Sequence, residues 1–131
     1  MRRIRLLLVL EGTSFVAAAL VHFGVLARGY EHQKAGTAES VIGGVLLAAL
    51  ALTFASAPRT RAIGLAAQAF ALLGTLVGLF TIAVGVGPRT APDLAYHAAI
   101  LSLLAVGLLV TARRPGASRS VTPAVARATG R

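Results

Sequence analysis

Residues 41–55 read VIGGVLLAALALTFA, an almost purely aliphatic run that follows Glu39 and Ser40 and ends shortly before Pro58. With its flanking residues the run extends over about 38–57, close to the roughly 20 apolar residues that a helix needs to cross a bilayer. Pro58 closes it, because proline cannot continue a helix and disfavours helical geometry in the residue before it. The stretch therefore predicts a transmembrane helix.

Three further segments of the chain have the same character. Residues 4–27 are apolar apart from a few polar positions that include Glu11 and His22. Residues 62–86 contain Gly74-x-x-x-Gly78, a spacing that lets helix backbones approach closely. The predicted spans are 4–27, 38–57, 62–86 and 93–112. We expect an all-α membrane protein, with one four-transmembrane-helix bundle over residues 1–115 and a disordered basic cytoplasmic tail over 116–131.

The composition agrees with this expectation. Of 131 residues, 56% are hydrophobic and 13% are charged, whereas soluble domains have about 25% charged residues. Four spans leave no room for a soluble catalytic domain, and the lack of cysteine excludes thiolate metal sites and disulfides. Motifs of phosphate-binding loops, zinc helices and nucleophile elbows are missing too. These observations favour a non-enzymatic protein without deciding the point.

The charges predict an orientation, N-in/C-in, in a bacterial-type cytoplasmic membrane. The net charge is +9, and most basic residues fall at one side of the proposed bundle, as the positive-inside rule requires. The predicted cytoplasmic set is Arg2, Arg3, Arg5, Arg59, Arg61, Arg113, Arg114, Arg119, Arg127 and Arg131; the external set is Arg28, Lys34 and Arg89. We expect anionic lipid headgroups, not nucleic acid, as partners of the arginines, and a homo-oligomer or larger membrane complex.

Four ionisable residues are predicted to converge at the external side. At about 1.5 Å rise per residue, His22 and His97 lie at a similar depth, roughly 7 Å inside the boundary. Glu39 opens the second span, and Asp93 precedes His97 by one helical turn. The set His22, Glu39, Asp93 and His97 suits a transition metal, and His22 with His97 suits the axial positions of a b-type haem. The helix dipole also explains both acids, and it favours a capping role for Asp93 over a ligand role. Contacts between helices also explain both histidines.

A second polar group is predicted deeper in the bundle. Glu11 and His22 are eleven residues apart, which places them on the same face of a helix. Gln68 lies at a depth similar to that of Glu11 in the third span. This polar stripe of Glu11 and Gln68 allows two interpretations, a path for protons or solutes and a hydrogen bond that joins two helices.

Residues 38–47, AESVIGGVLL, are followed by a short loop with Arg61 and an alanine-rich third span. Over residues 38–80 this pattern resembles DoxX-type four-helix integral membrane proteins, in which a glutamate just before a Gly-Gly-x-Leu-Leu run opens the second helix. The first span departs from that pattern, because it ends in His22-Phe23-Gly24 where a Gly-x-x-Lys element is expected. The resemblance implies the fold and an association with membrane redox or quinone chemistry, without fixing an activity.

The sequence is consistent with three functions. The first is a non-enzymatic membrane component or accessory subunit in which the polar residues are structural. The second is a metal-, haem- or quinone-linked membrane redox protein that uses the external His and carboxylate cluster. The third is a small transporter or channel whose path follows Glu11, Gln68 and His22.

Overall fold

The computed structural model describes residues 1–113, so the tail expected at 116–131 lies outside the described residues. The described chain is all-helical. Its elements are α1 (Arg2–His22), α2 (Gln33–Ala55), the short 3₁₀ helix η1 (Ala57–Arg59), α3 (Thr60–Ala83) and α4 (Ala91–Ala112). Each of the four α-helices is long and apolar enough to span a membrane.

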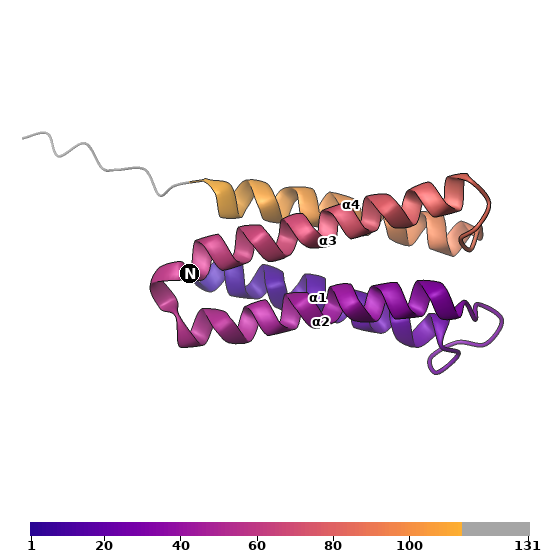
Figure 1. The fold of residues 1–131 in the computed structure, drawn as a ribbon, viewed down its shortest axis with the longest axis horizontal. Coiled ribbons are helices and arrows are strands. Elements are labelled where there is room, and N and C mark those ends of the chain that lie inside the picture. The colour runs from indigo at the N-terminus through magenta and orange to yellow at the C-terminus, as the bar shows by residue number, and fades with distance from the viewer. Residues whose placement is uncertain (114–131) are drawn as a thin grey trace, which may run out of the picture.

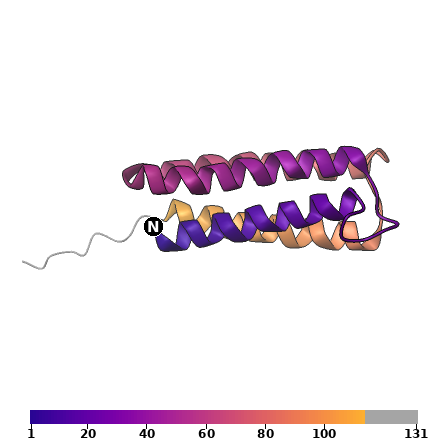
Figure 2. The ribbon, with the colours of Figure 1, turned by 90° about the horizontal axis from the view of Figure 1, so that it is seen from below.

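The four helices run alternately up and down along one common direction (Figure 1). Viewed at 90° to this, α2 and α3 form one layer and α1 and α4 form the other (Figure 2). The start of α1, η1 and the end of α4 therefore meet at one end of the bundle, which we call the basic end. The connections 23–32 and 84–90 lie at the opposite end, which we call the loop end.

Two helix boundaries differ from the predicted spans for identifiable reasons. Helix α1 ends at His22 rather than near residue 27, because Gly24 turns the chain with a φ of 73°. Helix α2 begins at Gln33 rather than near residue 38, because the side chain of His32 accepts a hydrogen bond from the Ala35 backbone N–H at 3.2 Å. Histidine is an uncommon residue at this capping position, so no residue pattern predicted the cap.

The bundle buries a mixed interior and exposes an apolar exterior. Leu8, Leu46 and Leu104 are fully buried in the core, where they pack with the other members of one apolar cluster. Large apolar side chains such as Leu73 and Phe80 are about two-thirds exposed, at 64% and 65%. Polar side chains, by contrast, are found inside: the buried set is Glu11, His22, Glu39, Thr53, Thr60, Gln68, Thr75, Asp93, His97 and Thr111.

Two arginines at the basic end hold the ends of neighbouring helices. Arg5 donates to the Thr53 hydroxyl at 3.1 Å and to the Thr53 carbonyl at 2.7 Å, in the last turn of α2. Arg61 donates to the carbonyl of Thr111 at 3.0 Å and also to that of Ala112, in the last turn of α4. The last carbonyls of a helix have no partner within it. These arginines thus satisfy them across helix boundaries.

Candidate functional site

His22, the last residue of α1, lies between two acidic side chains at the loop end. Its Nδ1 is 2.7 Å from Oε2 of Glu39 on α2, and its Nε2 is 3.1 Å from Oδ1 of Asp93 on α4. All three side chains are buried, with exposed fractions of 3% for His22, 6% for Glu39 and 7% for Asp93. We call this group the triad. It joins three of the four helices through side chains that lie far apart in the sequence.

Proton counting constrains the chemistry of the triad. Each of the two contacts needs a proton between a ring nitrogen and a carboxylate oxygen, because ionised carboxylates only accept hydrogen bonds. A neutral imidazole carries only one such proton. The three groups therefore hold two protons between them. Either His22 is an imidazolium between two carboxylates, or it is a neutral imidazole between one carboxylate and one protonated carboxyl group.

Asp93 has two structural roles at once. With Thr90 it forms a capping box at the start of α4, in which the Thr90 hydroxyl accepts from the Asp93 backbone N–H at 3.3 Å. One of its oxygens, Oδ2, serves this cap and also accepts from the Thr90 hydroxyl. The other oxygen, Oδ1, faces His22. The two sequence-based interpretations of Asp93, as a cap and as a member of the cluster, therefore describe different oxygens of one carboxylate.

His97 lies near the triad but is held differently. Its Nδ1 is 2.8 Å from the backbone carbonyl oxygen of Asp93, one turn earlier in α4. Since a carbonyl oxygen only accepts, Nδ1 carries the proton and Nε2 of the neutral ring is an acceptor. Within residues 1–113 no hydrogen bond joins His97 to the side chains of the triad. The structure thus brings together His22, Glu39 and Asp93 and places His97 beside them.

The donor arrangement bears on the metal hypothesis. Both ring nitrogens of His22 already face carboxylates, so neither lone pair is directed at an open position. In the part of the chain that the structure describes, no group of three or more His, Cys, Asp or Glu side chains is placed so that it could hold a metal ion. The geometry gives no direct support to a metal held by His22, Glu39, Asp93 and His97.

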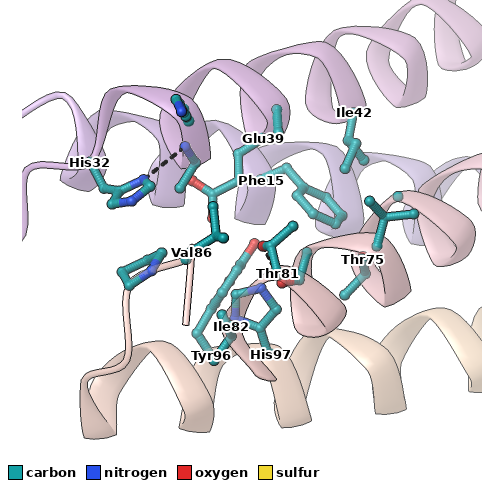
Figure 3. Close-up of a pocket in the computed structure, with 18 residues that line it drawn as sticks. Phe15, His32, Glu39, Ile42, Thr75, Thr81, Ile82, Val86, Tyr96 and His97 are labelled. Atoms are coloured by element: carbon teal, nitrogen blue, oxygen red, sulfur yellow. Dashed lines mark hydrogen bonds between the residues drawn. The ribbon is translucent and has the colours of Figure 1, made fainter. Parts of the chain in front are cut away.

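A cavity of about 190 Å³ lies between α2, α3 and α4 at the loop end. Its walls are mostly apolar and include Phe15, Ile42 and Ile82, and Figure 3 shows Glu39 on one side of it with Tyr96 and His97 on the other. Gly74 and Gly78 of α3 also line it. From the sequence, these glycines were predicted to serve helix packing only. Gly74 does serve packing, because a Cβ there would collide with Ile42. Gly78 has a second effect, because its missing side chain leaves space beside Nε2 of His97.

Three polar groups of the cavity wall have bonding capacity left. Oε1 of Glu39 has no hydrogen-bond partner among residues 1–113, since His22 contacts only Oε2. Nε2 of His97 has no hydrogen-bond partner there either, since the ring's one hydrogen bond in these residues is made by Nδ1. The hydroxyl of Tyr96 is buried and lacks a partner in the same residues. Together with the His32 and Lys34 side chains that also line it, these groups give the cavity two acceptors and one hydroxyl between mostly apolar walls.

Tyr96 was not a candidate in the sequence. It precedes His97 in a helix without other aromatic residues, and nothing in its spacing separates it from an interfacial tyrosine. In the structure its ring packs edge-on against Phe15 at 6.4 Å and against His97 at 5.8 Å between centroids. Only these contacts from two helices place the hydroxyl at the cavity.

Glu11 and Gln68 form a separate polar pair in the middle of the bundle. The Gln68 amide donates to both oxygens of Glu11, at 2.9 and 3.1 Å, and both side chains are fully buried. Gly107 of α4 faces the pair directly, and a Cβ at this position would collide with Oε1 of Glu11 and with the Gln68 amide. The sequence allowed either a path for protons or solutes or a hydrogen bond that joins two helices. The structure contains that hydrogen bond, between α1 and α3.

Comparison with known proteins gives no relative for this chain: no family model, no curated protein and no solved structure matches it.

Proposed function

We propose that the chain is an integral membrane protein with both termini in the cytoplasm of a bacterial-type cell. The exposed apolar belt, which includes Leu73 and Phe80, supports insertion, because such side chains are stable in lipid and costly in water. The orientation is supported by the charges of the described residues. The basic end carries Arg2, Arg3, Arg5, Arg59, Arg61 and Arg113, and the loop end carries Arg28, Lys34 and Arg89.

Within this frame the proposed function is the binding of a quinol-type headgroup in the cavity at the loop end. The observation that carries the proposal is the pairing of apolar walls with unused acceptors, Oε1 of Glu39 and Nε2 of His97. A ligand for such a site needs an apolar ring with hydroxyl groups that donate. A quinol has two such groups, reaches the site from the lipid phase and can also accept from Tyr96.

The size of the cavity separates this ligand from the alternatives. At about 190 Å³ it is smaller than the pockets of about 300–1,000 Å³ that take drug-sized molecules. A single substituted ring fits that volume better than a porphyrin. The protein itself supplies no reacting group in this proposal, so it acts as a non-enzymatic membrane component or accessory subunit that holds a quinol. The resemblance to DoxX-type proteins points to the same chemistry.

The transport alternative has weaker support. The pair Glu11 and Gln68 is fully buried, and Gly107 closes directly over it. A path along this stripe would have to break the two hydrogen bonds that hold Glu11. We therefore propose a structural role for the pair.

The experiment is a titration monitored at the histidine rings. The chain has only three histidines, so ¹⁵N labelling of the imidazoles gives a small set of signals in detergent or nanodiscs. We expect saturable shifts of the His97 signals on addition of a short-chain benzoquinol under anaerobic, reducing conditions. The dimethyl ether of the same quinol cannot donate. It should bind at least about tenfold more weakly, since one hydrogen bond to a charged acceptor contributes about 1.5–3 kcal/mol.

A matched pair of glycine variants provides the control. Gly78→Leu puts a side chain beside His97 and should abolish the saturable shift, whereas the position of Gly44 on α2 is open and Gly44→Leu should leave the shift unchanged. Equal affinity for the quinol and its ether, or a quinol effect that survives Gly78→Leu, would refute the proposed site.

A further inference from the structure

A second hollow lies at the basic end, far from the quinol cavity. Its volume is about 930 Å³, and it is bordered by the start of α1, by η1 with the start of α3, and by the end of α4. The basic residues of its wall come from all three places: Arg2, Arg3, Arg61 and Arg113. None of the described residues that line it is acidic. The hollow is therefore a concentrated region of positive charge.

Thr111 gives this hollow a polar group without an internal use. The residue is 1% exposed and lines the hollow, and its hydroxyl has no partner among residues 1–113. A buried helical threonine normally donates to a carbonyl of the preceding turn, as Thr75 does to Ala71 at 2.8 Å. A buried polar group without a partner is costly, so a phosphate oxygen that reached the Thr111 hydroxyl would supply the acceptor that it lacks among residues 1–113.

Arg61 shapes the same wall. Two carbonyls of the last turn of α4 fix its guanidinium, those of Thr111 and Ala112. This holds a positive charge beside the last carbonyls of α4, in the wall of the hollow. Arg2 and Arg3, by contrast, are exposed at the start of α1 and can turn toward a ligand.

We propose that this hollow binds the phosphate group of an anionic phospholipid. Phosphate oxygens are strong acceptors, and arginine is the side chain best suited to them. Basic hollows between transmembrane helices on the cytoplasmic side are suited to lipid headgroups. The volume accommodates a whole headgroup with the beginning of its acyl chains. The proposal rests on membrane insertion, as proposed above, but not on the quinol site.

Native mass spectrometry of the full chain in detergent tests the proposal. The probe is phosphatidylglycerol, compared with phosphatidylcholine, which has no net charge, and with inorganic phosphate. We expect one phosphatidylglycerol to be retained under conditions that remove phosphatidylcholine, and inorganic phosphate alone to leave that complex intact. Equal retention of the two lipids would overturn the proposal, and so would displacement of the lipid by millimolar phosphate.

Matched variants locate the lipid. Arg2→Gln and Arg3→Gln should each weaken phosphatidylglycerol binding about fivefold, the equivalent of about 1 kcal/mol per basic residue. Arg28→Gln and Arg89→Gln remove the same charge at the loop end and should have no effect. An equal loss from both sets would mean that net charge alone attracts the lipid, which would refute a defined site.

Thr111 supplies the most specific variant. Thr111→Val keeps the shape but removes the hydroxyl, and it should weaken phosphatidylglycerol binding at least threefold with no loss of thermal stability. Thr13→Val is the control, since Thr13 is exposed and its hydroxyl donates to the Val9 carbonyl of its own helix. An unchanged lipid affinity in Thr111→Val would remove this hydroxyl from the site and overturn the proposal as stated. A quinol titration of the same variant should be normal, so the two proposals fail independently.

Discussion

Gly107 lies where α4 passes the pair Glu11 and Gln68, and the pair fills the space that a side chain would need. We predict that Gly107→Ala lowers the free energy of unfolding by about 1–3 kcal/mol, as overpacking of a buried site does. Thermal unfolding in detergent, followed by circular dichroism, measures the change. Gly44→Ala is the control, because nothing lies within 4 Å of its added carbon. That variant should be neutral or slightly stabilised, since alanine is the better helix former. A Gly107→Ala protein as stable as Gly44→Ala would show that the pair is not packed as described.

His22 is the residue on which the triad depends. His22→Ala leaves the carboxylates of Glu39 and Asp93 buried without the group that lies between them. Removing one partner of a buried ion pair costs about 3–5 kcal/mol. We therefore predict that His22→Ala lowers the free energy of unfolding by that amount. Glu31→Gln, at an exposed position of the same end, should have little effect. A similar stability of the two variants would contradict the role given to His22.

The sequence predicted the triad better than it predicted the neighbours of the triad. Positions along the helices predicted one depth for His22, Glu39, Asp93 and His97, and the structure brings the side chains of the first three together. The sequence did not predict that His97 bonds to a backbone carbonyl instead. Depth along a helix follows from residue number, but the direction of a side chain follows from packing. The Tyr96 hydroxyl and the space beside Gly78 depend on such packing and had no signal in the sequence.

At the scale of elements, two arginines join helices that are distant in the sequence. Arg61 at the start of α3 holds the last carbonyls of α4. We predict that Arg61→Gln lowers the free energy of unfolding by about 1.5–3 kcal/mol, the usual contribution of hydrogen bonds to a charged group. Arg59→Gln, at an exposed position in η1, removes the same charge and should be neutral. Hydrogen exchange at the end of α4 should rise in the first variant only. Equal exchange in both would indicate that these contacts do not hold the helix end.

The helix boundaries show why such contacts cannot be predicted from the sequence. Hydropathy located all four helices, but the end of α1 depends on the turn at Gly24, and the start of α2 depends on the His32 cap. The positive-inside rule treats Arg5 and Arg61 only as charges on the cytoplasmic side. In the structure their guanidinium groups also donate to carbonyls of other helices. This second role depends on which helix ends are neighbours, and hydropathy carries no information on that.

At the scale of the whole molecule, the bundle has two chemically different ends. The described arginines concentrate at the basic end, and the triad with its cavity lies at the loop end. Both proposed sites depend on this polarity. A quinol would enter from the membrane near the outer surface, and an anionic lipid would bind at the cytoplasmic surface. Both proposed sites therefore require that the chain crosses the membrane four times, with the loop end outside.

The chain has no cysteine, which allows a direct test of that claim. Single-cysteine variants Lys34→Cys, at the loop end, and Arg59→Cys, at the basic end, are treated in intact cells with a membrane-impermeant maleimide. We predict that Lys34→Cys is labelled at once and that Arg59→Cys is labelled only after the membrane is permeabilised. The reverse pattern, or labelling of both positions in intact cells, would contradict the proposed arrangement in the membrane.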